Sequence, residues 1–270
     1  MSENFLRKAV DFLLTSSKPH LQFHFFGGEP LMVPFQRIKN TILYGERKMK
    51  KMKKNIQFII TTNGILLDEK KLKFFKEHKV LLELSLDGKP EAQDKNRPQR
   101  GGQSSYYLIV KNLPLLWKSG VKNSCSMVVS PLTVDNLKEN FLHIIELGFK
   151  KIFMMTACGL DWRGKLEKLK ENLEEILKIY PELLKKKKII LLNLKEWLNP
   201  FRMNTELAID TDGKIYSACV TYLIPDSKLR KKFVLGHICK VKTSIDEFEK
   251  KRLDNEKAMK VIYESQNILH

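Results

Sequence analysis

The feature of this sequence that most constrains its fold is a repeated alternation of short apolar runs with longer amphipathic segments. The segments between the runs have the spacing of helices, and each run with its helix occupies roughly 25–35 residues. Strands joined by helical crossovers lie parallel in one sheet, so the sequence predicts an α/β fold. We expect buried strands at 21–26, 56–61, 80–86, 124–129 and 151–156.

Helices are expected before and between these strands, and the last third of the chain has a different pattern. The first helix, 2–14, opens the chain without a preceding strand. Further helices are expected at 33–54, 68–78, 106–119, 135–147 and 165–180, the last ending before Pro181. The C-terminal third predicts a further strand at 189–194, a hairpin at 207–219 around Asp212-Gly213, a strand at 233–238 and a helix at 244–266.

Charge and composition limit the possible partners. The chain has 49 Lys and Arg against 31 Asp and Glu, a net charge of +18. Much of the excess lies in lysine runs at 47–54 and 185–188, without the interleaved aromatic residues that stack on bases, so nucleic acid is not a favoured partner. No run approaches the roughly 20 apolar residues of a membrane span. Four widely spaced cysteines do not suit a disulfide scaffold, so we expect a reducing, cytoplasmic setting and no membrane partner.

A Gly-Gly-acid turn follows the first predicted strand. Gly27 and Gly28 let the backbone approach a ligand closely, and Glu29 offers a carboxylate to an ammonium group. A simple tight turn with an exposed acid explains the same residues, so both interpretations stay open. Ligands of parallel α/β folds bind at the carboxyl ends of the strands, which is where this turn lies.

Polar residues also follow the next two predicted strands. Asn63 ends the second strand, Ser85 and Asp87 end the third, and Arg97 lies in the polar loop beyond. Since the carboxyl ends of parallel strands meet at one edge of a sheet, these side chains and the Gly-Gly-acid turn predict a shared ligand site. Arg97 could bind a carboxylate through two parallel hydrogen bonds.

The segments FGGEPL at 26–31, TTNG at 61–64 and SLDG at 85–88, followed by Asp94 and Arg97, resemble the radical SAM superfamily. The resemblance is to its SPASM/twitch-type branch, which contains anaerobic sulfatase-maturase-like and peptide-modifying enzymes. It implies a partial (β/α)6 TIM-type barrel, here missing its first strand, with a small C-terminal α+β extension. We accordingly expect a partial barrel at 1–160, a helical connection at 161–203 and the SPASM/twitch-like extension at 204–270.

The resemblance also implies a chemistry. Members of the family bind S-adenosylmethionine and a [4Fe–4S] cluster, and cleave the cofactor reductively to a 5′-deoxyadenosyl radical that abstracts a substrate hydrogen. A peptide or protein substrate and an electron donor such as flavodoxin or ferredoxin are implied as partners. Carried over by position, Gly27, Gly28 and Glu29 would hold the methionyl amino group. Ser85 and Arg97 would contact the ribose and carboxylate end of the cofactor, and Asn63 would line the same rim.

The sequence departs from the family in two places. Gln93 stands before Asp94, where the family often has a histidine. The family's CxxxCxxC loop is missing, because no cysteine precedes Cys125, so the thiolate ligands of the radical SAM cluster are absent. We therefore expect a truncated chain that is inactive as written. Two alternatives are a non-catalytic SAM-fold binding or scaffold protein that has lost the cluster, and a basic polyanion-binding protein.

The remaining cysteines and one histidine have structural interpretations. Cys125, on a predicted strand, is expected in the core, and Cys158 near the rim of the sheet. Cys219 resembles the first ligand of an auxiliary cluster and is a candidate metal ligand or relic, although a buried free thiol is the commoner outcome for such a residue. His24 is expected as a hydrogen-bonded core residue, on a strand packed on both faces.

Overall fold

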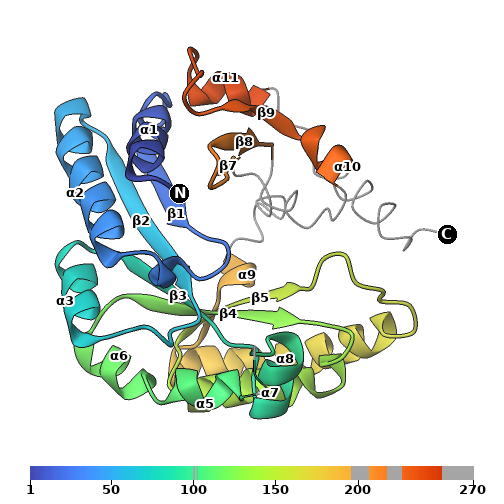
Figure 1. Ribbon diagram of the computed structural model, residues 1–270. Helices are drawn as coiled ribbons and strands as arrows, with labels where there is room; N and C mark the ends of the chain where they lie inside the picture. Colours follow the sequence, from blue (N-terminus) through green and yellow to red (C-terminus); the bar gives the residue numbers. More distant parts are fainter. Residues whose placement is uncertain (100, 102, 196–206, 218–226, 251–270) are drawn as a thin grey trace. The chain divides into compact units, whose positions relative to one another are not determined.

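The computed structural model describes residues 1–99, 101, 103–195, 207–217 and 227–250, and its main element is a six-stranded sheet. The strands lie in the order β1 to β6, and the neighbouring pairs from β2 to β6 are parallel (Figure 1). The strands are β1 (His20–Phe25), β2 (Asn55–Thr62), β3 (Leu81–Ser85), β4 (Asn123–Val129), β5 (Lys151–Thr156) and β6 (Ile190–Leu191). The α/β fold with a parallel sheet is thus confirmed, and the sheet is open rather than closed into a barrel.

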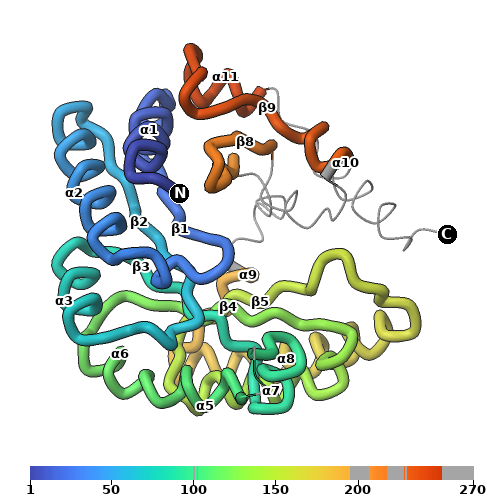
Figure 2. The backbone as a smooth tube through the Cα atoms, viewed as in Figure 1, coloured from blue at the N-terminus to red at the C-terminus, as the bar shows by residue number. Residues whose placement is uncertain are grey.

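Helices connect successive strands, as Figure 2 shows along the chain. They are α1 (Glu3–Leu14), η1 (Pro30–Met32), α2 (Phe35–Met52), α3 (Glu69–Glu77), α4 (Pro90–Asn96), α5 (Ser105–Val110), α6 (Leu113–Ser119), η2 (Val134–Asn136), α7 (Leu137–Glu146), α8 (Leu166–Lys187) and α9 (Leu192–Lys195). The C-terminal part adds β7 (Ala208–Ile209), β8 (Lys214–Tyr216), α10 (Ser227–Lys231), β9 (Val234–His237) and α11 (Ile245–Lys250). Strands β7, β8 and β9 form a separate antiparallel sheet.

The chain groups into two compact units. The first contains 1–23, 33–58 and 199–270, and the second contains 24–32 and 59–198. This grouping follows spatial contacts, and the three-part division by sequence stays a prediction.

In the first unit, α1 packs against α2 and against the C-terminal sheet. Phe12 of α1 meets Phe248 edge-on, with ring centroids 5.2 Å apart. Ile215 and Ile238 complete this small apolar cluster, and burying four such side chains together stabilises the attachment of α11.

In the second unit, strand residues alternate between a buried face and a more open face. Leu82 and Leu84 of β3 are almost completely buried, as are Cys125 and Met127 of β4, so this face forms the core. On the other face, Glu83 and its strand neighbours are only half-buried. The carboxyl ends of these strands carry the loops that build the candidate site.

Several local predictions hold and others need correction. The helices expected to begin at 2 and 68 are present, and the side chains of Ser2 and Asp68 cap them as α1 and α3. The helix expected at 106–119 is two helices, α5 and α6, because Pro114 lies in the first turn of a new helix. The expected break at Pro181 is wrong, since α8 continues through it to Lys187.

His24 also differs from its expected environment. Its side chain is about 32% exposed, because β1 is not packed on both faces at this position. It hydrogen-bonds Thr61 Oγ1 at 2.6 Å, so the expected hydrogen bond is present while the core location is wrong. Of the terminal helix expected at 244–266, the structure describes α11, and the remainder lies outside the described residues.

Candidate functional site

The turn after β1 places two glycines and an acid at the carboxyl edge of the sheet. Gly27 and Gly28 have φ of +88° and +54°, in the region that favours glycine. Both are exposed, and a side chain added at either would meet nothing within 4 Å. The backbone of this turn is therefore unobstructed, and ligand binding at this turn stays a prediction.

The carboxylate of Glu29 ties this turn to the end of β2. Its Oε1 accepts hydrogen bonds from Thr62 Oγ1 at 2.7 Å and from the Leu31 backbone N–H at 3.0 Å. Its Oε2 accepts from the Asn63 N–H at 2.8 Å. Glu29 is therefore a structural link between neighbouring strand ends, and its Oε2, which accepts one hydrogen bond, keeps acceptor capacity for an ammonium group.

Asn63 shapes the same loop. Its Oδ1 accepts from the Ile65 N–H at 3.0 Å, which closes a tight turn after β2. The Asn112 amide bonds the carbonyls of Gly64 and Ile65 at 2.9 Å and holds this turn from the side of α6. The structure thus gives Asn63 a role in the loop, and contact of its side chain with a ligand stays a prediction.

A buried ion pair lies at the end of β3. The side chain of Asp87 has no exposed surface, and Arg97 donates to it from Nε at 2.8 Å and from Nη2 at 3.0 Å. The Val128 backbone N–H donates to the same carboxylate at 2.8 Å. Arg97 keeps about a third of its side chain exposed, and its Nη1 has no partner in the described part of the chain. The geometry therefore presents one edge of a fixed guanidinium to the outside.

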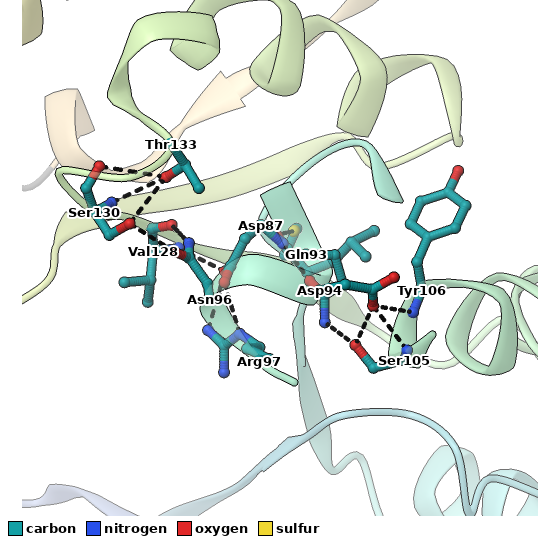
Figure 3. Close-up of polar contacts among 12 residues, drawn as sticks. Asp87, Gln93, Asp94, Asn96, Arg97, Ser105, Tyr106, Val128, Ser130 and Thr133 are labelled. Atoms are coloured by element: carbon teal, nitrogen blue, oxygen red, sulfur yellow. Dashed lines mark hydrogen bonds and ion pairs between the residues drawn. The ribbon is translucent and has the colours of Figure 1, made fainter. Parts of the chain in front are cut away.

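The loop between Asp87 and α5 is held by buried amide and hydroxyl groups (Figure 3). Gln93 is completely buried; its Oε1 accepts from the Asp87 N–H at 2.8 Å and its Nε2 donates to Ser105 Oγ at 3.2 Å. Asp94 Oδ1 accepts from the N–H groups of Ser105 at 2.8 Å and Tyr106 at 3.3 Å. Burial acts to raise the pKa of Asp94, but the hydrogen bonds at the start of α5 outweigh it and hold that pKa below its usual value. Gln93 and Asp94 are thus structural here.

A second network fixes the loop after β4 (Figure 3). Asn96 Nδ2 donates to the Val128 carbonyl at 3.0 Å, and Ser130 Oγ donates to Asn96 Oδ1 at 2.6 Å. Thr133 Oγ1 accepts from the Ser130 N–H at 3.1 Å. These contacts join α4 to the end of β4, beside the Asp87–Arg97 pair.

A cavity of about 290 Å³ opens between these loops, within the second unit. Its polar wall includes Arg97, Asn96 and Ser130, and its apolar wall includes Leu132 and Leu160. These two leucines are 67% and 42% exposed, so the apolar wall has surface left to contact a ligand. Anionic and hydrogen-bonding groups of a ligand suit one wall, and a flat apolar group suits the other.

The described cysteines do not form a metal site. Cys125 is fully buried, and burial together with nearby Asp87 raises the pKa of its thiol. Burial also raises the pKa of Cys158, whereas Cys239 is exposed. Among the described residues, no three His, Cys, Asp or Glu side chains are grouped as metal ligands. Cys219, the predicted auxiliary ligand, lies outside the described residues.

Comparisons with known proteins identify the family of this chain. Residues 2–139, half of the chain, match the family model described as the radical SAM superfamily. The chain belongs to the radical SAM superfamily. The matched stretch contains the Gly-Gly-Glu turn and the Asp87–Arg97 pair but ends before β5.

Two sulfatase-maturating enzymes are similar in sequence to this radical SAM protein. A serine-type anaerobic enzyme from Bacteroides thetaiotaomicron is 30% identical over 136 residues, or 50% of this chain. A cysteine-type enzyme from Clostridium perfringens is 28% identical over 163 residues, or 60% of this chain. The matched stretches span 32% and 43% of those two relatives.

Two solved structures share the fold. Native anSMEcpe with bound AdoMet and a peptide superposes with a TM-score of 0.77 at 21% identity, covering 97% of this chain and 75% of that one. SuiB from Streptococcus suis, bound to its precursor peptide SuiA, gives a TM-score of 0.54 at 15% identity, covering 84% and 55%. The partial TIM-barrel class predicted from sequence is thereby confirmed.

Most of the side chains predicted to bind the cofactor lie at the carboxyl edge of the parallel sheet. Gly27, Gly28 and Glu29 adjoin Asn63, while Ser85, buried at the end of β3, leads into Asp87 and its partner Arg97. Sequence reasoning missed the loop after β4, which supplies Ser130 and Leu132 to the cavity. The signal was the polar turn directly after the strand at 124–129, the same pattern that marked the earlier strand ends.

Proposed function

We propose that the second unit binds S-adenosylmethionine along the carboxyl edge of β1 to β4. The observation that carries this proposal is the open Gly-Gly-Glu turn on the same sheet edge as the cavity beside Arg97. The cofactor combines an amino group, a carboxylate and a nucleoside, and each has a matching group at this edge. The Glu29 carboxylate and the Gly27–Gly28 backbone suit the amino group, and Arg97 Nη1 suits the carboxylate or a ribose hydroxyl.

The apolar wall of the cavity suits the base. Leu132 and Leu160 expose large side chains toward a space bordered by backbone and hydroxyl groups, which favours a flat ring over a second charge. Ser85 is buried beside Asp87, and its hydroxyl is the candidate for the ribose. Asn63 fixes the turn between the two halves of the site.

The family cluster does not fit the described residues. One thiol is buried in the core, another is half-buried, and the third lies in the other unit, so these cysteines do not supply three converging ligands. When bound, the cluster and S-adenosylmethionine together supply one-electron cleavage chemistry. Because the described residues offer no ligand set for the cluster, we infer that this chain alone binds the cofactor without cleaving it.

The wider activity rests on the family. Relatives are named as sulfatase-maturating enzymes, and the solved neighbours are complexes with peptides, which supports a peptide or protein substrate for the complete reaction. Hydrogen abstraction from such a side chain requires an electron donor, for which flavodoxin or ferredoxin is proposed. In the described part, no helix is long and apolar enough to cross a bilayer. A cytoplasmic location stays part of the proposal.

The lack of a cysteine ligand set for the cluster among the described residues also favours a second candidate function. A protein that keeps the S-adenosylmethionine site but holds no cluster would act by binding, as a scaffold or a sensor of the nucleoside. The two functions separate in one experiment on a longer form of the protein that carries the family's CxxxCxxC loop, because both predict binding of S-adenosylmethionine while only the enzyme predicts release of 5′-deoxyadenosine under reduction with iron and sulfide.

Calorimetric titration with S-adenosylmethionine tests the binding proposal. We expect saturable binding to the 270-residue chain in the absence of iron, weakened at least about tenfold by Leu132→Asp, because a carboxylate then faces the base. Met52→Asp is the matched control, since Met52 is 45% exposed and lines neither the cavity nor the turn. Folded protein that gives no binding, or equal binding by both variants, would overturn the proposal.

A further inference from the structure

Helix α8 carries a line of leucines that its own unit leaves uncovered. Leu166, Leu177 and Leu184 are 62%, 46% and 46% exposed, and Leu173 between them is half-buried. The helix packs on α7 (Figure 1) and on η2. Its buried residues Ile176 and Leu183 lie on a different face from the exposed leucines. The exposed line is therefore additional to the face that holds α8 on the sheet.

These four leucines share one narrow stripe. With 3.6 residues per turn, positions 166, 173, 177 and 184 point within about 40° of one another around the helix axis. The stripe runs along most of α8, which has 22 residues and a length of about 33 Å. A straight apolar stripe of this length has the geometry of a helix–helix contact rather than of scattered surface leucines.

The spacing of the stripe is symmetric about position 175. Leu166 and Leu184 are each nine residues from it, and Leu173 and Leu177 are each two residues from it. When two copies pair antiparallel about a twofold axis at this position, Leu166 meets Leu184 of the other copy and Leu173 meets Leu177. In a twofold contact each pair occurs twice, so every leucine of the stripe is covered. We propose that α8 pairs antiparallel with α8 of a second copy of this chain.

Charge distribution along α8 supports the antiparallel direction. The half at 166–175 has four acids and two lysines, whereas the half at 176–187 has one acid and four lysines. A parallel pair would place like halves together, and an antiparallel pair places acidic halves against basic ones. The choice of a second copy, rather than another protein, follows from this self-complementarity.

Individual charges beside the stripe lie in the same register. Glu174 and Lys178 lie on the same side of the leucine stripe. Their midpoint is one residue from position 175, and the same holds for Glu167 and Lys185. Glu167 also bonds Lys170 within its own helix at 3.2 Å. In the antiparallel pair, Glu174 of one copy faces Lys178 of the other, twice by symmetry.

One helix face is small for a stable dimer. A single helix pair lies below the roughly 1,200 Å² that specific stable interfaces bury, so we expect weak, reversible association with a dissociation constant of about 10–100 μM. Sedimentation velocity of the full chain over about 1–200 μM should show the shift from monomer to dimer. Leu177→Lys should remove this shift, because it places two ammonium groups in the centre of the contact. Met52→Lys, an equally exposed apolar-to-lysine change on α2, should leave it intact.

A charge exchange tests the register independently of the apolar contact. Glu174→Lys and Lys178→Glu should each weaken association about three- to tenfold, and the double variant should restore it. Circular dichroism on each variant establishes that the helix is retained. A chain that stays monomeric across the whole range overturns the proposal. Association that survives Leu177→Lys also overturns it, as does a double variant no better than either single change.

Discussion

Replacing Asp87 by Asn should destabilise the second unit, because this carboxylate joins three segments from a fully buried position. It accepts two hydrogen bonds from Arg97 and one from the Val128 N–H. Asn keeps the shape and one acceptor oxygen, which can still serve Val128. It loses the negative charge, and its NH2 group then faces the donors of the guanidinium.

The size of the effect follows from the exposure of the two partners. Breaking a buried ion pair costs about 3–5 kcal/mol when the remaining charge stays buried. Arg97 is one-third exposed and recovers part of its hydration, so the expected loss in the free energy of unfolding is about 2–3 kcal/mol. Urea unfolding followed by circular dichroism measures it as a lowered midpoint with an unchanged slope.

The chain offers a matched control for this measurement. Arg163 and Asp161 form a similar two-bond pair, at 2.9 Å from Nε and 2.5 Å from Nη2, but both side chains are largely exposed. Asp161→Asn should therefore leave the unfolding midpoint unchanged, since water replaces the lost partner. If both variants lower the unfolding midpoint equally, the burial of Asp87 does not determine how much its ion pair contributes to the free energy of unfolding, and the reasoning is refuted.

Three further predictions concern other parts of the chain. Gly88→Ala should lower the free energy of unfolding by about 2 kcal/mol or more, measured by urea unfolding, because the added methyl lies 2.4 Å from atoms of α7 and φ is +136°. Hydrogen bonds from the backbone and side chains of Ser16–Ser17 lower the pKa of Asp246 to about 2. Because this folded-state pKa is depressed, the contribution of Asp246 to the attachment of α11 should be fully present above about pH 4 and lost as the pH falls through 2. Hydrogen exchange of α11 should become faster over this range, and Asp246→Asn should remove this pH dependence. Exposed Cys239 should react with iodoacetamide in the folded chain while buried Cys125 should not, as mass spectrometry of the two peptides can measure. Equal labelling of the two cysteines would contradict the core position of Cys125.

The sheet was predictable because burial on one face leaves a strong pattern of apolar residues. Strand β5 coincides with its predicted range, and the other main strands of the sheet differ by one or two residues at their ends. The continuation of α8 through Pro181 was not predictable in this way. A proline removes one backbone hydrogen bond of a helix. Pro181 lies on an exposed face of α8, so water can hydrogen-bond the carbonyl that loses its partner. Burial of Leu183 then stabilises the helix beyond the proline.

The candidate site was predictable in position more than in detail. Motifs at the strand ends located Glu29 and Arg97 at one edge, because parallel strands all end there. The partners of these side chains were not visible in the sequence. Arg97 is bound by Asp87 from within the chain, and that pairing depends on how α4 folds back over β3, a tertiary arrangement that residue spacing does not encode.

The most direct test of cofactor binding at this sheet edge is a crystal structure of the chain grown with S-adenosylmethionine and without iron. We predict electron density for the cofactor, with its amino group at the turn of Gly27 to Glu29, its carboxylate or ribose at Arg97, and its base against Leu132. A well-ordered protein with that edge empty at saturating cofactor, or with the cofactor bound elsewhere, would contradict the proposed site.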